Sequence, residues 1–247
     1  MFTPIDVQSP PVGLRRGHRV SDLPLLPGAV PGVETVYCVQ PKDVERVLLP
    51  GTGQARVLLF FSGDGDVDWA TGRSAFSDVA AWAGTTAVKV RAISSRLEYL
   101  DIRLDRGQGE LARTGKHFFT RYAECETYGE AIKSAVTVSR TIVPPQVVPR
   151  FCMGSVETAG PDEVGAHLHP ILDQLFWGLP GNDCVVTADD AQAPFGERVL
   201  LHVPLASRHG VKVQEGKRLH YVWMDFFGRE EDLSYIQQQH VPTSGKP

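Results

Sequence analysis

Two histidines separated by one residue, His167 and His169, are the side chains of this sequence best suited to binding a metal ion. Side chains alternate between the two faces of a β-strand, so on a strand both imidazoles would point the same way. Gln174 begins the next apolar run, and His209 begins a later alternating run, His-Gly-Val-Lys-Val. Imidazole nitrogens suit zinc, iron, copper and nickel, and a side-chain oxygen adds manganese. These four residues are therefore candidate ligands of a divalent transition metal.

The spacing of these residues resembles the two sequence motifs of the cupin superfamily. The first family motif is roughly Gly, five residues, His-x-His, three or four residues, Glu, six residues, Gly. From His167 onward the sequence fits this pattern as far as Gly181, with Gln174 in place of the glutamate. Asp173 is the alternative ligand, because the family spacing allows either position. The leading glycine does not fit, since Gly160 lies one residue too far upstream.

The second family motif, roughly Pro-x-Gly-x-x-His-x-x-x-Asn, follows at a workable separation. Pro204 and His209 match its proline and histidine, whereas Ala206 and Val213 replace its glycine and asparagine. The resemblance implies an all-β fold of double-stranded β-helix (jelly-roll) barrels. It also implies that His167, His169, Gln174 and His209 converge inside one barrel.

An internal repeat indicates two such barrels in one chain, a bicupin. Residues 96–99 (Arg-Leu-Glu-Tyr) align with residues 218–221 (Arg-Leu-His-Tyr) at an offset of 218 − 96 = 122, and fixed-offset similarity is typical of duplicated units. The same offset places Ala87 opposite His209, and no histidine lies between His18 and His117. The first barrel is therefore predicted to be degenerate and metal-free; a ligand pocket without metal is the alternative.

Alternating apolar residues between Gly, Pro and Asp clusters predict the strands and domain limits. We expect an irregular arm over residues 1–32, a degenerate barrel over 33–115, a connector over 116–146 and a metal-binding barrel over 147–247. The predicted strands are Thr35–Val39, Val57–Phe61, Thr86–Arg91, Leu97–Leu104, Val147–Val156, Gln174–Gly178, Asp183–Ala188, Val199–Val203, Gly210–Gln214 and Leu219–Phe227.

The composition narrows the class of protein. The chain has 247 residues, of which 42% are hydrophobic, which is enough for one large or two small cores. No apolar run approaches the roughly 20 residues of a membrane span, and the first residues lack the pattern of a signal peptide. A net charge of −4 without a basic cluster argues against a nucleic-acid partner. Four scattered cysteines fit free thiols in a reducing cytoplasm, so we expect a cytoplasmic protein.

Two further residues are candidates for catalysis. A symmetric turn after the run that starts at His209 would place His220 opposite Val211, inside the metal cavity, where it could act as a general acid or base. A three-residue turn would instead direct Leu219, Tyr221 and Trp223 inward. Arg150 could clamp a substrate carboxylate, although a surface or inter-barrel salt bridge is the alternative.

Glu157 and Asp225 are weaker candidates for contact with a substrate.

Three classes of function remain open. The first is a non-redox enzyme, an isomerase, lyase or hydrolase, which binds a small polar carbonyl or sugar-acid substrate. The resemblance favours it, since cupins with a glutamine ligand have such roles. The second is a dioxygenase, and the third is a non-catalytic binding protein. We expect one divalent transition metal per chain (Zn, Mn, Fe or Ni), a small-molecule substrate, no membrane partner and a homo-oligomer.

Overall fold

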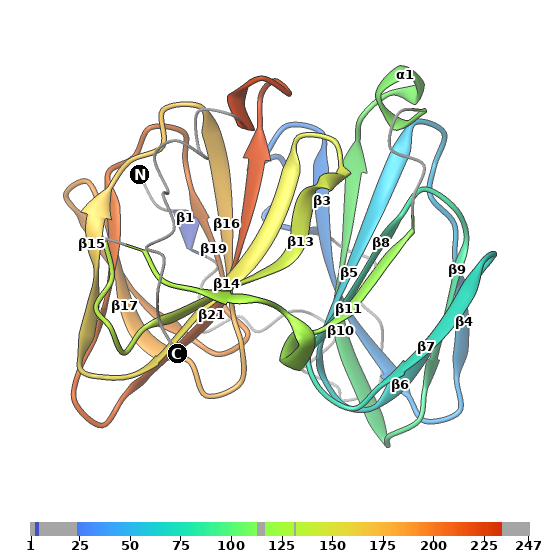
Figure 1. The fold of residues 1–247 in the computed structure, drawn as a ribbon, viewed down its shortest axis with the longest axis horizontal. Coiled ribbons are helices and arrows are strands. Elements are labelled where there is room, and N and C mark those ends of the chain that lie inside the picture. The colour runs from blue at the N-terminus through green and yellow to red at the C-terminus, as the bar shows by residue number, and fades with distance from the viewer. Residues whose placement is uncertain (1–2, 5–23, 113–116, 131, 234–247) are drawn as a thin grey trace. The chain divides into compact units, whose positions relative to one another are not determined.

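Four antiparallel sheets make up most of the regular structure in a computed structural model of the chain (Figure 1). The structure describes residues 3–4, 24–112, 117–130 and 132–233. The contacts within it divide the chain into two compact units. The C-terminal unit contains the first short strand and, among the described residues, 126–145 and those from Arg150 onward. The N-terminal unit contains the other described residues up to Cys125, together with 146–149.

The C-terminal unit consists of a seven-stranded and a four-stranded sheet that lie face to face (Figure 1). The strand order is β1-β19-β16-β21-β14-β13-β12 in the first and β15-β20-β17-β18 in the second. The strands are β1 (Thr3–Pro4), β12 (Thr127–Tyr128), β13 (Val138–Val148), β14 (Phe151–Ala159), β15 (Asp162–His167), β16 (Leu172–Gly178), β17 (Asp183–Ala188), β18 (Ala191–Gly196), β19 (Leu200–Val203), β20 (His209–Val213) and β21 (Arg218–Phe227).

The N-terminal unit has sheets of order β11-β8-β5-β10-β3-β2 and β4-β9-β6-β7. Its elements are β2 (Pro24–Leu25), β3 (Val33–Pro41), β4 (Glu45–Leu48), β5 (Gln54–Ser62), β6 (Gly65–Trp69), β7 (Gly72–Phe76), β8 (Ala80–Gly84), β9 (Val88–Ala92), β10 (Arg96–Asp105), the helix α1 (Gln108–Leu111), β11 (Phe118–Arg121) and the 3-10 helix η1 (Tyr122–Glu124). None of the described helices is long and apolar enough to cross a membrane.

The two units share one topology, which confirms the two-barrel prediction. The order β8-β5-β10-β3 corresponds strand for strand to β19-β16-β21-β14, and β4-β9-β6-β7 corresponds to β15-β20-β17-β18. β10 and β21 both begin at the arginine of the repeated segment and both contain 10 residues. The repeat in the sequence therefore marks the same central strand in each barrel.

Each barrel is closed by apolar side chains that its two sheets direct toward each other. In the C-terminal unit, Val186 and Val211 of the smaller sheet pack with Phe176, Leu201 and Leu219 of the larger one. The strands alternate between buried and more exposed positions, because one face of each sheet covers the core. In β17, for example, Cys184, Val186 and Ala188 are buried, and the residues between them are not.

The structure differs from the predicted elements in several places, and it adds strands that were not predicted, among them β4, β6, β7, β8, β15 and β18. The predicted strand Val147–Val156 is two strands, since Arg150 takes a positive φ of 55° in the turn between β13 and β14. The stretch 116–146, predicted to connect the barrels, supplies β11 to the N-terminal unit and β12 and most of β13 to the C-terminal unit. Edge strands of this kind are hard to predict, because they alternate only weakly between apolar and polar residues.

Candidate metal centre

Three histidines meet at one end of the four-stranded sheet of the C-terminal unit. His167 ends β15 and pairs directly with His209, which begins β20. His169 lies two residues further along, in the loop before β16. Their ligand nitrogens all lie within 4.8 Å of one another, so small shifts would bring each to the 2.0–2.1 Å that zinc–imidazole bonds require. The triad is the metal-ligating cluster that the sequence predicts.

Backbone carbonyls orient two of the imidazole rings. Nδ1 of His167 donates to the Gly165 oxygen at 2.8 Å, and Nδ1 of His209 donates to the Ser207 oxygen at 3.0 Å. In each case the acceptor lies two residues before the histidine. A proton on Nδ1 leaves the lone pair on Nε2, which is the arrangement that a metal ligand needs.

Gln174 approaches the same cavity from the opposite sheet. Its side chain is 6% exposed, and its Nε2 donates to Oδ1 of Asp225 at 2.8 Å. Its Oε1 is buried and accepts no hydrogen bond from the described residues. A buried amide oxygen without a donor is costly, and a cation at the centre would satisfy it. The orphaned oxygen is thus a structural reason to place Gln174 beside the histidines.

Asp173, the alternative ligand, points away from this cavity. Neighbouring residues of a strand face opposite sides of the sheet, and Gln174 faces inward. Oδ1 of Asp173 accepts from the backbone N–H of Leu205 at 3.1 Å and lies 3.1 Å from Nε2 of His202. The carboxylate therefore contributes to the turn before the second motif rather than to the triad.

Asp225 is the acidic side chain that the structure adds to the site. It lies directly opposite Gln174 in the β16–β21 pair and is 6% exposed. The sequence indicated it only as a weak candidate, because its partner strand is 51 residues away along the chain. A carboxylate at this place polarises the amide of Gln174, so it supports the ligand oxygen electrostatically without binding the ion.

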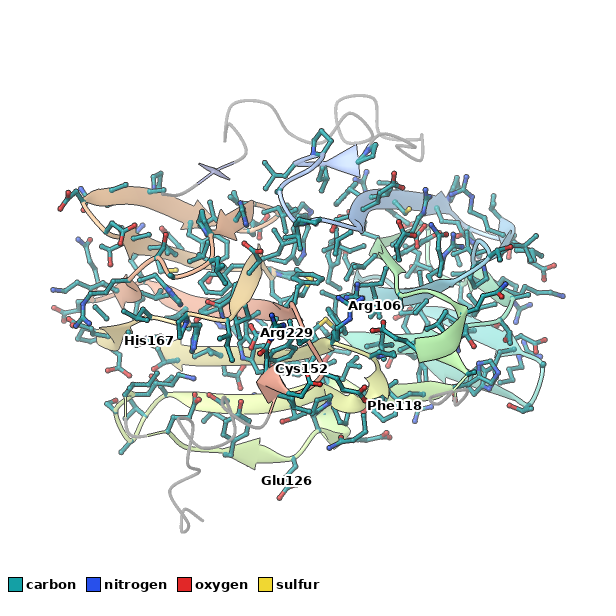
Figure 2. All side chains as sticks on the ribbon, turned by 90° about the horizontal axis from the view of Figure 1, so that it is seen from above. Arg106, Phe118, Glu126, Cys152, His167 and Arg229 are labelled. Atoms are coloured by element: carbon teal, nitrogen blue, oxygen red, sulfur yellow. The ribbon has the colours of Figure 1, made fainter. Side chains whose placement is uncertain are left out.

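The triad opens into a cavity of about 370 Å³, a size that suits a small ligand. Figure 2 labels three of its lining residues, Glu126, Cys152 and His167, which come from separate segments of the chain. The lining consists of Glu126, Tyr128, Glu130, Ile132, Lys133, Thr141, Pro145, Cys152, Val156, Val164, His167, His169, Gln174, Phe176, His209, Val211, Tyr221, Trp223, Asp225 and Leu233. All of these residues belong to the C-terminal unit.

His220 does not line this cavity, because β20 and β21 do not form a hairpin. The two strands belong to different sheets, and Val211 pairs with Val164 and Val186. The inward side chains of β21 are Leu219, Tyr221 and Trp223, so the prediction for His220 is wrong and the alternative set of inward residues is the one observed.

His220 instead lies against other polar groups of the C-terminal unit. Its Nδ1 lies 3.3 Å from the Pro180 oxygen, and its Nε2 lies 3.6 Å from Oε2 of Glu157. Burial lowers its pKa, with Arg218 adding to the effect.

Arg150 also lies outside the cavity lining. Its Nη1 donates at 3.5 Å and 3.4 Å to the oxygens of Phe227 and Gly228, at the end of β21. These two contacts are with backbone carbonyls, and the predicted carboxylate clamp and salt bridge both stay predictions.

The N-terminal barrel carries other residues at the equivalent positions. The cross-strand pair His167–His209 corresponds to Leu48–Val88, so the counterpart of His209 is Val88 rather than the predicted Ala87. The Gln174–Asp225 pair corresponds to Arg56–Arg103. Arg56 is 6% exposed, and its Nε lies 3.1 Å from Oδ1 of Asp101. Two aliphatic side chains and a guanidinium group cannot ligate a metal cation.

Comparisons with known proteins locate the fold. No model of a protein family and no curated protein matches the sequence. Among solved structures, the chain is similar to the glyoxylate-induced protein of Pseudomonas aeruginosa (TM-score 0.71, 10% identity, 83% of this chain and 78% of that one). It is also similar to the oxalate decarboxylase of Lactobacillus farciminis, solved with formate (TM-score 0.62, 11% identity, 82% of this chain and 78% of that one). A third similar structure is a cupin 2 conserved barrel domain protein from Leptotrichia buccalis (TM-score 0.59, 16% identity, 91% of this chain and 96% of that one).

These matches define the class of protein: the chain has the all-β, two-barrel cupin fold, as the resemblance of its motifs implied. Within that class it is a bicupin with one histidine triad, located in the C-terminal barrel of the described chain.

Proposed function

We propose that this bicupin is a metal-dependent, non-redox enzyme, an isomerase, lyase or hydrolase, whose substrate is a small polar carbonyl compound or sugar acid. The observation that carries the proposal is the ligand set. Three imidazoles whose ligand nitrogens lie within 4.8 Å of one another share a cavity of about 370 Å³ with the buried oxygen of Gln174. A divalent ion with four neutral ligands keeps its positive charge, and such an ion acts as a Lewis acid on a carbonyl oxygen.

The cavity contains further groups that suit a polar substrate. Burial raises the pKa values of Tyr128 and Tyr221 well above their usual range, so both phenols stay protonated and can donate hydrogen bonds. Burial, reinforced by Asp225, raises the pKa of Cys152 in the same way. These side chains can bind and orient substrate oxygens, while Val164, Phe176 and Val211 limit the access of water.

The oxalate decarboxylase among the similar structures supports the proposal. It shares this fold at 11% identity, and its name describes the breakdown of a small dicarboxylic acid. Two cupin barrels can therefore house lyase chemistry on a small anion.

A dioxygenase is the second candidate, because three imidazoles also hold Fe(II) and the cavity leaves room for a further ligand. One experiment separates the candidates. The full chain is loaded in turn with Zn²⁺, Mn²⁺, Ni²⁺ and anaerobic Fe²⁺, and then offered small hydroxy-carbonyl compounds and keto acids in D₂O. Proton NMR follows hydrogen–deuterium exchange, and an oxygen electrode follows uptake.

We expect exchange in the zinc or manganese form without oxygen uptake, and none after chelation. Oxygen consumption by the iron form alone would favour the dioxygenase. A protein that binds metal and neither exchanges protons nor consumes oxygen with any compound of the panel would be a binding protein.

A further inference from the structure

A short segment outside the barrel strands forms part of the cavity wall. The backbone N–H of Gly165 in β15 donates to the Ile132 oxygen at 2.9 Å. Further along, Oγ of Ser134 donates to Oδ2 of Asp162 at 2.8 Å, and Oγ1 of Thr137 donates to the same oxygen. Residues 132–137 are thus attached to the strand that ends at His167. The attachment holds Lys133, the residue after Ile132, in the wall of the triad's cavity.

Lys133 forms a closed polar cluster there. Its Nζ donates to Oε2 of Glu130 and, at 2.8 Å, to Oγ of Ser139. Oγ of Ser139 in turn donates to Oε2 of Glu130 at 3.2 Å. The side chains of Lys133 and Glu130 are only 6% and 7% exposed, and both line the cavity. The cluster is therefore screened from bulk water but faces the space in front of the triad.

Lys133 is the only lysine or arginine among the described residues of the cavity lining. An ammonium group has three donors, and its two partners in the cluster account for two of them, which leaves one for a ligand. Burial lowers the pKa of Lys133 to about 7, and the charge of Asp225 opposes this shift. Glu130 and Ser139 contact the amine directly, and an ionised Glu130 favours the ammonium form, so it also opposes the shift caused by burial. An amine that gains and loses its proton near neutral pH can serve as an acid or a base.

We propose that Lys133 is the proton-transfer residue of the metal cavity and that Glu130 and Ser139 are its positioning residues. The inference rests on the proposed function. As a neutral amine, Nζ takes a proton from the carbon beside a substrate carbonyl. The C–H electron pair moves toward the carbonyl oxygen, which accepts the negative charge. The ammonium group then returns a proton to carbon, so that protons and electrons balance.

The first test measures the state of the amine itself. Cyanate carbamylates only unprotonated amines, and peptide mass spectrometry reports the modification of each lysine. The metal-loaded full chain is labelled between pH 5 and pH 10. Lys212 and Lys89, whose side chains are 69% and 42% exposed, are internal controls on the surface.

We expect half-maximal labelling of Lys133 at about pH 7 and a pH profile different from that of Lys212. A profile equal to that of Lys212 would overturn the proposal. Absence of labelling at every pH would do the same, because an amine sealed from cyanate could not meet a substrate.

The second test measures proton transfer. Lys133→Met removes the amine, and Lys133→Arg keeps a positive charge and its donors but does not titrate near neutral pH. Both should slow deuterium exchange into dihydroxyacetone or pyruvate by at least about 100-fold, the usual range for a lost acid–base group. Their metal content should stay that of the native chain. Glu130→Gln should shift the pH profile of exchange, and Lys212→Met, on the surface, should exchange at the native rate.

Native exchange by Lys133→Arg would overturn this inference and leave the proposed function intact. Absence of exchange in every metal form of the native chain would contradict the proposed function, and the role of Lys133 would be rejected with it.

Discussion

Gln174 determines how much positive charge the metal centre keeps. An amide ligand brings a dipole to the ion, whereas the usual cupin glutamate brings a full negative charge. In this chain a carboxylate lies one hydrogen bond further out, since Asp225 accepts from the amide nitrogen of Gln174 at 2.8 Å. The ion would therefore feel the negative charge at a distance, through the polarised amide.

The Gln174→Glu variant tests this arrangement. It should still bind metal, but in the metal-free chain two buried carboxylates would face each other across β16 and β21. We expect the free energy of unfolding of the metal-free protein to fall by about 1–3 kcal/mol, the usual effect of a lost partner for a buried polar group. Urea unfolding with and without metal measures this free energy. Asp225→Asn added to Gln174→Glu should restore the stability, because the asparagine again supplies a donor; no recovery would contradict the pairing.

The His209→Ala variant should lose the metal. The imidazole of His209 is 2% exposed, and its ring centre lies 4.5 Å from that of His167. Removing it should weaken metal affinity by more than the roughly 10–100-fold that a lost supporting contact costs. Elemental analysis after dialysis provides the measurement. His202→Ala is the matched control. His202 is also buried, but it lies outside the cavity lining, with its Nε2 3.1 Å from Oδ1 of Asp173. A full metal complement in His209→Ala would refute the ligand assignment.

At the scale of elements, β15 supports both halves of the candidate site. Its last residue, His167, is a candidate ligand, and its first residue, Asp162, accepts hydrogen bonds from Ser134 and Thr137 in the segment that carries Lys133. Burial would raise the pKa of Asp162, but the hydrogen bonds from Thr137 and Ser134 outweigh it and lower the pKa below the usual value. The segment and the strand are therefore held together most firmly when Asp162 is ionised.

The Asp162→Ala variant should destabilise the protein by about 1–3 kcal/mol at pH 7. A lowered pKa in the folded state gives stability that is present above the unfolded value, about 3.9, and that disappears as the pH falls through the folded value. The difference between native and variant protein should therefore shrink below about pH 4. Urea unfolding of the native and variant proteins at pH 7 and pH 3 measures the difference in stability at each pH. Glu163→Ala, at a side chain 60% exposed, should change little; an equal effect of both substitutions would argue against the role of Asp162.

At the scale of the whole molecule, one topology serves two different purposes. The C-terminal barrel encloses a cavity beside three histidines. In the N-terminal barrel, Phe60, Trp82 and Tyr99 fill the interior between the sheets, and Leu48, Val88 and Arg56 stand at the positions of the ligands. The barrels differ in these side chains and also in the added strands β12 and β13, whose residues Tyr128 and Thr141 line the cavity.

One divalent metal ion per chain is the expected stoichiometry. The triad is the only group of at least three potential ligands found among the described residues. Elemental analysis of metal-replete protein checks the ratio, and two ions per chain, or none, would contradict it. Removing the metal should also lower thermal stability, because a ligand at 100 times its Kd adds about 2.7 kcal/mol.

We also predict a homodimer or higher oligomer. The arm over residues 1–32 is rich in apolar residues, of which Leu25, Leu26 and Val30 belong to the described residues and Val20 and Leu23 do not. Val47 and Leu49, at the edge strand β4, are 58% and 66% exposed, and exposed edge strands commonly pair or are covered. Light scattering at micromolar concentration should report at least twice 27.1 kDa. Leu49→Lys should weaken the association, and a monomeric native chain would refute it.

The sequence by itself determined the fold class, the duplication and the identity of the histidine ligands. These features depend on local spacing, such as His-x-His on a strand, and on the repeat that begins at Arg96 and Arg218. Only the tertiary structure decided which other residues join the triad. Asp225 faces Gln174 because β16 pairs with β21, Lys133 lines the cavity because its segment binds β15, and His220 lies outside because β20 and β21 belong to different sheets. Pairing between distant strands has no local sequence pattern, so these neighbours could not be predicted from spacing.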